Sequence, residues 1–144
     1  MYPTGFARFT SSLIGHVEPI ALPAQSTPLD YEGELAAVSW KGGRGISREL
    51  ALDHVAGYSI FNDATLRDYQ FWTPQWTMSK NFDRTGAFGL WFVIADELPS
   101  GGDGLRIQAR LNGEVSHDDS TSYMIFVFVM LVAMLERRDD AATR

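Results

Sequence analysis

The sequence predicts one α+β domain, mainly of strands joined by short helices, and three observations support this. A two-residue alternation over residues 30–40 places Glu32 and Glu34 on the same face of a strand. Apolar and polar residues also alternate within residues 105–115 around Asn112-Gly113, the dipeptide that a tight hairpin turn demands. Finally, 144 residues with 45% hydrophobic composition can bury one core but not comfortably two.

The other expected elements are short. Ser47 is placed to cap a helix that Gly57 would end, and Asp63 falls where an aromatic and β-branched strand gives way to a second helix. In chain order we expect extended loops over residues 1–28, the helix from Ser47, a strand over residues 58–61, a helix over residues 64–70, a strand over residues 90–95 and a glycine loop over residues 99–104.

Charge and composition exclude several classes of function. The net charge of -6 arises from 18 acidic and 12 scattered basic residues, so a nucleic-acid partner is not expected. The chain has no cysteine, which removes disulfides, thiolate nucleophiles and sulfur-ligated zinc and favours a cytoplasmic location. No signal peptide is evident, and the longest apolar run, residues 124–135, is too short for the roughly 20 residues of a membrane-spanning helix. That run is expected to be a buried core element.

Three carboxylates form a candidate metal site. Glu32 and Glu34 stand among apolar neighbours, where two like charges are unfavourable unless a cation lies between them. Asp63 follows a second apolar strand and could supply a third ligand. Oxygen ligands without sulfur or an adjacent histidine favour Mg²⁺, Mn²⁺ or Ca²⁺ over zinc. The alternative is that the two glutamates simply form a solvated strand edge.

A second group of polar residues follows Asp63. If a helix starts there, Arg67 and Gln70 lie four and seven residues further on and share its face, so a guanidinium that can bind a carboxylate would stand beside the proposed ligand. The alternative is an ordinary surface pair of Asp63 and Arg67. No serine lies in a Gly-x-Ser-x-Gly turn, so hydrolysis through an acyl-serine is not supported.

Several linked motifs resemble the fumarylacetoacetate hydrolase family over roughly residues 3–126. They occur in the family's order and spacing: Asp30-Tyr31-Glu32-Gly33-Glu34-Leu35, Ala56-Gly57-Tyr58 with Phe61-Asn62-Asp63, Arg67-Asp68 with Gln70, Lys80-Asn81-Phe82, Asn112-Gly113-Glu114 and Met124-Ile125-Phe126.

The resemblance implies a fold, a site and a class of reaction. The implied fold is a mixed β-sandwich roll with short helices, usually in a homodimer. The residues that match Glu32, Glu34 and Asp63 bind Mg²⁺ or Mn²⁺ in the family. Those that match Arg67, Gln70 and Lys80 line the substrate pocket. Family members cleave, hydrate, isomerise or decarboxylate 2-oxo acids and acylpyruvates.

Two parts of the family pattern are not found in the sequence. These are an upstream Gly-x-Asn-Tyr motif with a lid histidine that acts as the base, and a downstream Gly-Thr-Pro-x-Gly-Val-Gly loop. We therefore expect one partial domain over residues 1–144, incomplete at its C-terminus, with residues 127–144 as a divergent tail and no assigned catalytic base. Two hypotheses stay open: an enzyme that stabilises an enolate with its metal, and a non-catalytic remnant that keeps the metal site or only the fold.

Overall fold

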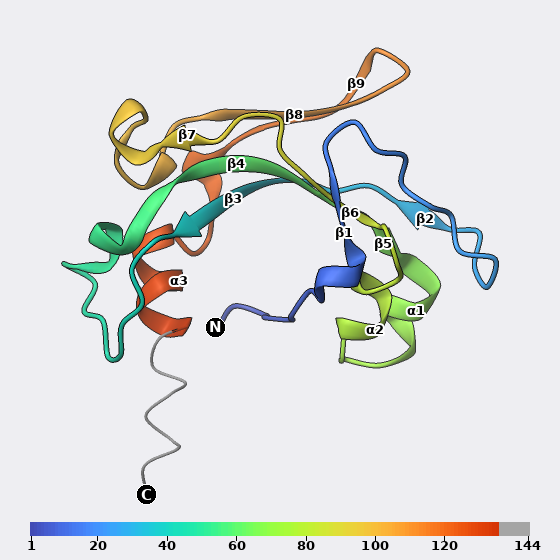
Figure 1. The fold of residues 1–144 in the computed structure, drawn as a ribbon, viewed down its shortest axis with the longest axis horizontal. Helices are drawn as coiled ribbons and strands as arrows, with labels where there is room; N and C mark the ends of the chain where they lie inside the picture. Colours follow the sequence, from blue (N-terminus) through green and yellow to red (C-terminus); the bar gives the residue numbers. More distant parts are fainter. Residues whose placement is uncertain (136–144) are drawn as a thin grey trace, which may run out of the picture. The chain divides into compact units, whose positions relative to one another are not determined.

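A computed structural model describes residues 1–135 and confirms an α+β fold made mostly of strands with a few short helices (Figure 1). The predicted tail lies outside the described residues from residue 136 onward. The strands are β1 (Leu13–Gly15), β2 (Leu29–Asp30), β3 (Gly33–Ser39), β4 (Val55–Asp63), β5 (Thr65–Leu66), β6 (Gly86–Phe88), β7 (Val93–Ile94), β8 (Arg106–Leu111) and β9 (Glu114–Ser120). The helices are α1 (Arg67–Trp72), α2 (Thr77–Lys80) and α3 (Phe128–Leu135), with short 3₁₀ helices at Thr10–Ser12, Ala51–His54, Ala95–Glu97, Ser100–Gly102 and Thr121–Tyr123.

The described chain divides into two compact units that share the long strands β3 and β4. The first, here called the carboxylate unit, consists of Tyr2–Leu35 and Ser59–Trp91. The second, the hairpin unit, consists of Ala36–Tyr58, the described part of Phe92–Arg144, and Met1. The expectation of a single domain stays a prediction.

In the carboxylate unit, β4 is an interior strand, and its C-terminal half is held by backbone pairing. The strand order is β1-β6-β4-β3, with β1 parallel to β6 and β6 antiparallel to β4. Asp63, the last residue of β4, lies opposite Gly86 in that register. The short pair of β2 and β5 comes next to the helices α1 and α2, which follow β5 in the chain (Figure 1).

The hairpin unit contains the N-terminal half of β4, β7, the β8–β9 hairpin and α3. The predicted hairpin is confirmed, and its turn has positive φ at both Asn112 and Gly113, as a tight two-residue turn requires. Tyr58 is buried, and its ring packs in a T-shaped arrangement against that of Phe128 from α3 at a centroid distance of 5.4 Å. The core of this unit therefore lies between β4 and α3.

Residues 1–28, expected to be extended loops, contain β1 and the 3₁₀ turn Thr10–Ser12, and three other expected elements also differ in the structure. The helix expected from Ser47 is reduced to the 3₁₀ turn Ala51–His54, because the backbone of Trp40 pairs with the carbonyl of His54 and the β-branched Val55 begins β4. The helix expected at residue 64 begins only at Arg67, since β5 comes first. The strand expected over residues 90–95 is limited to β7.

The apolar run over residues 124–135 is only partly a core element. Phe128 and Ala133 are buried, whereas Ile125 and Val127 are exposed. In the part of the chain that the structure describes, no helix is both long enough and apolar enough to cross a bilayer.

Gly57 is needed inside β4 rather than at a helix end. A Cβ atom on Gly57 would overlap the carbonyl oxygen of Val93 and come within 3.0 Å of Cα of Ile94, both on the paired β7. Backbone atoms cannot move aside as a flexible side chain can. We predict that Gly57→Ala lowers the free energy of unfolding by about 1–3 kcal/mol, measured by denaturant unfolding.

The matched control is Gly42→Ala, because a Cβ there meets no atom within 4 Å. Its stability should stay within about 0.5 kcal/mol of the parent chain. Equal stability of the two variants would show that β7 does not approach β4 as closely as described.

Candidate metal centre

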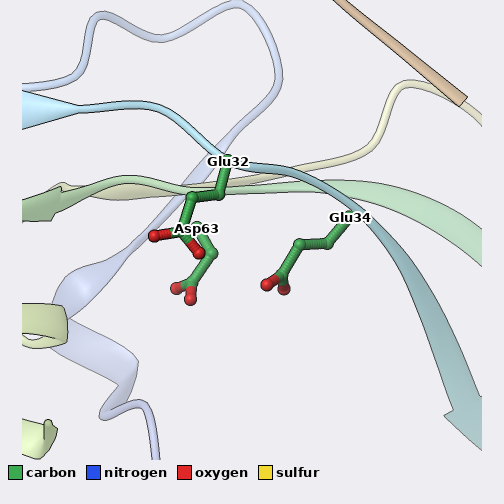
Figure 2. A group of neighbouring side chains, drawn as sticks. All are labelled: Glu32, Glu34 and Asp63. Atoms are coloured by element: carbon green, nitrogen blue, oxygen red, sulfur yellow. The ribbon is translucent and has the colours of Figure 1, made fainter. Parts of the chain in front are cut away.

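The three predicted carboxylates lie together in the carboxylate unit. Glu32, Glu34 and Asp63 each offer an oxygen, and these oxygens lie within 4.8 Å of one another. Figure 2 shows all three side chains on the same side of the strands, with the carboxyl groups of Glu32 and Asp63 adjacent and that of Glu34 beside them. Over residues 1–135 this is the only such group of three acidic or histidine side chains.

Strand pairing explains why these carboxylates meet. Glu34 lies in β3 and Glu32 immediately before it, so the two-residue period sends both side chains to one face. The backbone N–H of Asp63 donates to the carbonyl of Glu32 at 2.9 Å, which aligns the end of β4 with the start of β3. The Asn62 side chain accepts the N–H of Glu32 at 3.2 Å. Side-chain alternation and strand register thus fix the cluster together.

Lys80 is the central cation of this cluster. It ends α2, its side chain is only 2% exposed, and its Nζ lies 2.9 Å from Oε2 of Glu32 and 2.5 Å from Oδ2 of Asp63. The ring of Phe6 covers the ammonium at 5.0 Å from its centroid. The residue that the resemblance assigned to the substrate pocket therefore bridges two of the three candidate ligands.

Arg67 and Gln70 lie beside the cluster, but not in the way that the helical spacing predicted. Asp63 belongs to β4 and not to α1, so the three residues do not share a helix face. Arg67 instead bridges Asp30 at 2.7 Å and Oε1 of Glu32 at 2.6 Å, and its Nη1 donates to Oε1 of Gln70 at 2.8 Å. The surface pair of Asp63 and Arg67 offered as an alternative is therefore not formed.

Sequence reasoning missed Arg8. Its Nε lies 2.5 Å from Oδ1 of Asp63, although 55 residues separate them in the chain. The segment around Arg8 has no hydrophobic period and was expected to be a loop, so nothing local points to this contact. Only the pairing of β1, β6 and β4 brings the two residues together.

The environments of the two glutamates push their pKa values in opposite directions. Desolvation alone would raise the pKa of Glu32, but the hydrogen bond from Lys80, with help from Thr65 and Arg67, outweighs it and lowers the pKa below its usual value. Glu34 has no direct cationic partner among the residues described. Desolvation of its carboxyl group, followed by repulsion from Asp63, raises the pKa of Glu34 to about 7, although part of the side chain is exposed.

The donor set fits a hard divalent cation. Three carboxylate oxygens lie within 4.8 Å of one another, and an additional cation there would offset both the desolvation of Glu34 and its repulsion from Asp63, which together raise its pKa. Mg²⁺, Mn²⁺ and Ca²⁺ prefer such ligands at about 2.0–2.6 Å, so the oxygens, up to 4.8 Å apart, need move only slightly. The group is therefore a possible carboxylate metal site.

Comparison with known proteins identifies the family. Residues 1–138 match the sequence profile described as fumarylacetoacetate (FAA) hydrolase C-terminal. A mitochondrial oxaloacetate tautomerase of Xenopus laevis is 37% identical over 133 residues, which cover 91% of this chain and 41% of that protein. The chain belongs to the fumarylacetoacetate hydrolase family, as the motifs predicted.

Solved structures agree with this assignment. The fumarylacetoacetate hydrolase from psychrophilic Exiguobacterium antarcticum matches with a TM-score of 0.85 and 36% identity, covering 92% of this chain and 48% of that one. A 2-hydroxyhepta-2,4-diene-1,7-dioate isomerase from Mycobacterium marinum matches with a TM-score of 0.80 and 33% identity, covering 88% and 48%. The chain thus spans about half the length, or less, of these relatives, whose names describe a tautomerase, a hydrolase and an isomerase.

The raised pKa of Glu34 has a testable consequence for stability. Between the ordinary pKa of 4.5 and about 7, only the folded state keeps the proton on this residue, so its contribution to stability falls as pH rises through that window. We predict that Glu34→Gln, measured by thermal unfolding in a chelator, gains stability relative to the parent chain from pH 5 to pH 8.

The control for this comparison is Glu18→Gln. The backbone N–H of Gly15 and the Arg84 side chain lower the pKa of Glu18 below its usual value, so this carboxylate is ionised in both the folded and the unfolded state above pH 5, and the stability difference between Glu18→Gln and the parent should not change from pH 5 to pH 8. A stability difference between Glu34→Gln and the parent that does not depend on pH would contradict the assigned environment of Glu34.

Proposed function

We propose that this chain is a divalent-metal-dependent enzyme, or the catalytic part of one, that acts on 2-oxo acids or acylpyruvates. The observation that carries the proposal is the convergence of Glu32, Glu34 and Asp63 in a chain of the fumarylacetoacetate hydrolase family. Mg²⁺ is the proposed ion, with Mn²⁺ as its substitute and Ca²⁺ as a further candidate, since all three prefer oxygen ligands.

In the proposed chemistry, positive charges in the site stabilise negative charge on the substrate. When bound, the cation would supply Lewis-acid stabilisation of the negative charge that develops on the 2-oxo oxygen of the substrate. The three carboxylates would hold it. Lys80 would contribute a desolvated positive charge against the anionic substrate, because its side chain is buried and its ammonium faces the cluster.

Arg67 and Gln70 are proposed to orient the substrate carboxylate, as the family resemblance implies. The contacts of Arg67 with Asp30, Glu32 and Gln70 support a second role as well, because they hold Oε1 of the candidate ligand Glu32. The two roles predict different kinetic effects, and the experiment below separates them.

Hydrolysis, decarboxylation, isomerisation and hydration are all candidate reactions in this proposal, and the name of one relative adds tautomerisation. The general base is not assigned.

A homodimer and a cytoplasmic location complete the proposal, the first from the family resemblance and the second from the absence of cysteine. A small 2-oxo acid is the only other partner proposed.

The test is an assay with oxaloacetate and an acylpyruvate in Mg²⁺, in Mn²⁺ and in a chelator, run beside a calorimetric titration of the metal. The proposal predicts turnover of at least one substrate that the chelator abolishes and added metal restores. Metal binding without turnover would favour the alternative, a non-catalytic remnant that retains the site. Absence of metal binding would contradict the proposal as a whole.

Arg67→Lys is the informative variant in this assay. If Arg67 binds the substrate, KM should rise by about 10-fold or more, which corresponds to the roughly 1.5–3 kcal/mol of a charged hydrogen bond, while the Kd for Mn²⁺ stays unchanged. If Arg67 only anchors Glu32, the Kd for Mn²⁺ should rise instead. An unchanged KM together with an unchanged Kd would remove Arg67 from the site.

A further inference from the structure

Arg8 makes three separate side-chain contacts within the carboxylate unit. Its Nε donates to Oδ1 of Asp63 at 2.5 Å, its Nη2 to the carbonyl of Ala64 at 2.8 Å, and its Nη1 to Oγ1 of Thr85 at 3.2 Å. The guanidinium also lies over the ring of Phe61, at 5.4 Å from the centroid. The side chain is only 9% exposed. These contacts are therefore hydrogen bonds of a desolvated guanidinium and not a solvent-exposed surface ion pair.

The surroundings leave little freedom to this side chain. Asn81 clamps the backbone on both sides of Arg8, because its Nδ2 donates to the carbonyl of Ala7 at 2.8 Å and its Oδ1 accepts the N–H of Phe9 at 2.6 Å. Gly86 provides the space for the guanidinium, since a Cβ there would lie 2.6 Å from Nη1 of Arg8. Both backbone and head group are therefore fixed.

The consequence concerns the orientation of the Asp63 carboxylate. Arg8 binds Oδ1, whereas Lys80 binds Oδ2, so the two cations together fix the rotation of the carboxylate plane. A metal ligand must be held within about 0.5 Å of its productive position, and the groups that hydrogen-bond to ligands provide this. Lysine in place of Arg8 could occupy one of the three bonding positions but not all of them.

We propose that Arg8 is a positioning residue that orients Asp63 for the divalent cation. This inference rests on the proposed metal site and adds to it a residue outside the ligand set. The effect of this positioning on metal affinity is opposite in sign to the effect of the charge of Arg8. A positive charge 2.5 Å from a ligand oxygen repels a cation, so its removal alone would strengthen metal binding, whereas the loss of orientation weakens it.

The experiment measures the Kd of Mn²⁺ by isothermal titration calorimetry on the whole chain, first for the parent protein and then for Arg8→Lys, which keeps the charge but loses the planar fork. Arg8→Lys is expected to bind Mn²⁺ at least about 10-fold more weakly, the lower end of the effect of removing a group that orients a ligand. A Kd within twofold of the parent, or a lower one, would overturn the role of Arg8.

The matched control is Arg106→Lys. Arg106 also makes a two-point contact with a carboxylate, that of Asp118, but on the exposed hairpin of the other unit and outside the carboxylate cluster. The Kd of the Arg106→Lys variant for Mn²⁺ should equal that of the parent chain. A parent chain that does not bind Mn²⁺ contradicts the proposed metal site itself, which distinguishes that failure from a failure of the inference on Arg8.

Circular dichroism before each titration establishes that the variants are folded. Should Arg8→Lys not fold, Thr85→Val decides the question, because it preserves the shape of the residue while it removes the acceptor of Nη1, together with the hydroxyl's own hydrogen bond to the carbonyl of Phe82. The inference predicts a several-fold weaker Kd for Mn²⁺ in folded Thr85→Val. An unchanged Kd in this variant would overturn it.

Discussion

The constraint on which the site depends is electrostatic: three carboxylates converge in a partly desolvated place, and like charges there must be compensated. Four different segments supply Arg8, Lys80 and the three acids, and a fifth, the start of α1, supplies Arg67 as a further partner of Glu32. Arg8 comes from the first residues, the glutamates from the start of β3, Asp63 from the end of β4, and Lys80 from the end of α2. Removal of one partner from such a buried pair leaves an uncompensated charge, which is strongly destabilising. The ion pairs that compensate the charge of the carboxylates therefore also stabilise the fold.

That coupling also explains why the three carboxylates are not equivalent. Glu32 and Asp63 each have cationic partners, whereas Glu34 has none among the described residues and its pKa is raised to about 7. A divalent ion at this place would add the missing positive charge next to Glu34. This uneven compensation of the carboxylate charges is what we expect of a site that binds a further cation. Membership of the fumarylacetoacetate hydrolase family supports this interpretation.

Sequence alone could predict the parts of the site that depend on local periodicity. The alternation around Glu32 and Glu34 gave their common face, and the position of Asp63 at a strand end was confirmed. The hairpin turn at Asn112 was also predicted correctly, because Asn-Gly carries the turn geometry in its own backbone preferences. Arg8 could not be found in this way, since its contact depends on strand pairing across 55 residues. Gly57 was misread as a helix stop because the close approach of β7 is likewise a tertiary feature.

If the carboxylate cluster is a metal site, crystals grown with Mn²⁺ should reveal the ion there through its anomalous scattering. We expect one strong anomalous peak in the carboxylate unit, at about 2.0–2.6 Å from an oxygen of each of Glu32, Glu34 and Asp63, with Arg8 still bound to Asp63. A peak elsewhere, or none at saturating Mn²⁺ with Lys80 still bridging Glu32 and Asp63, would contradict the proposed metal site.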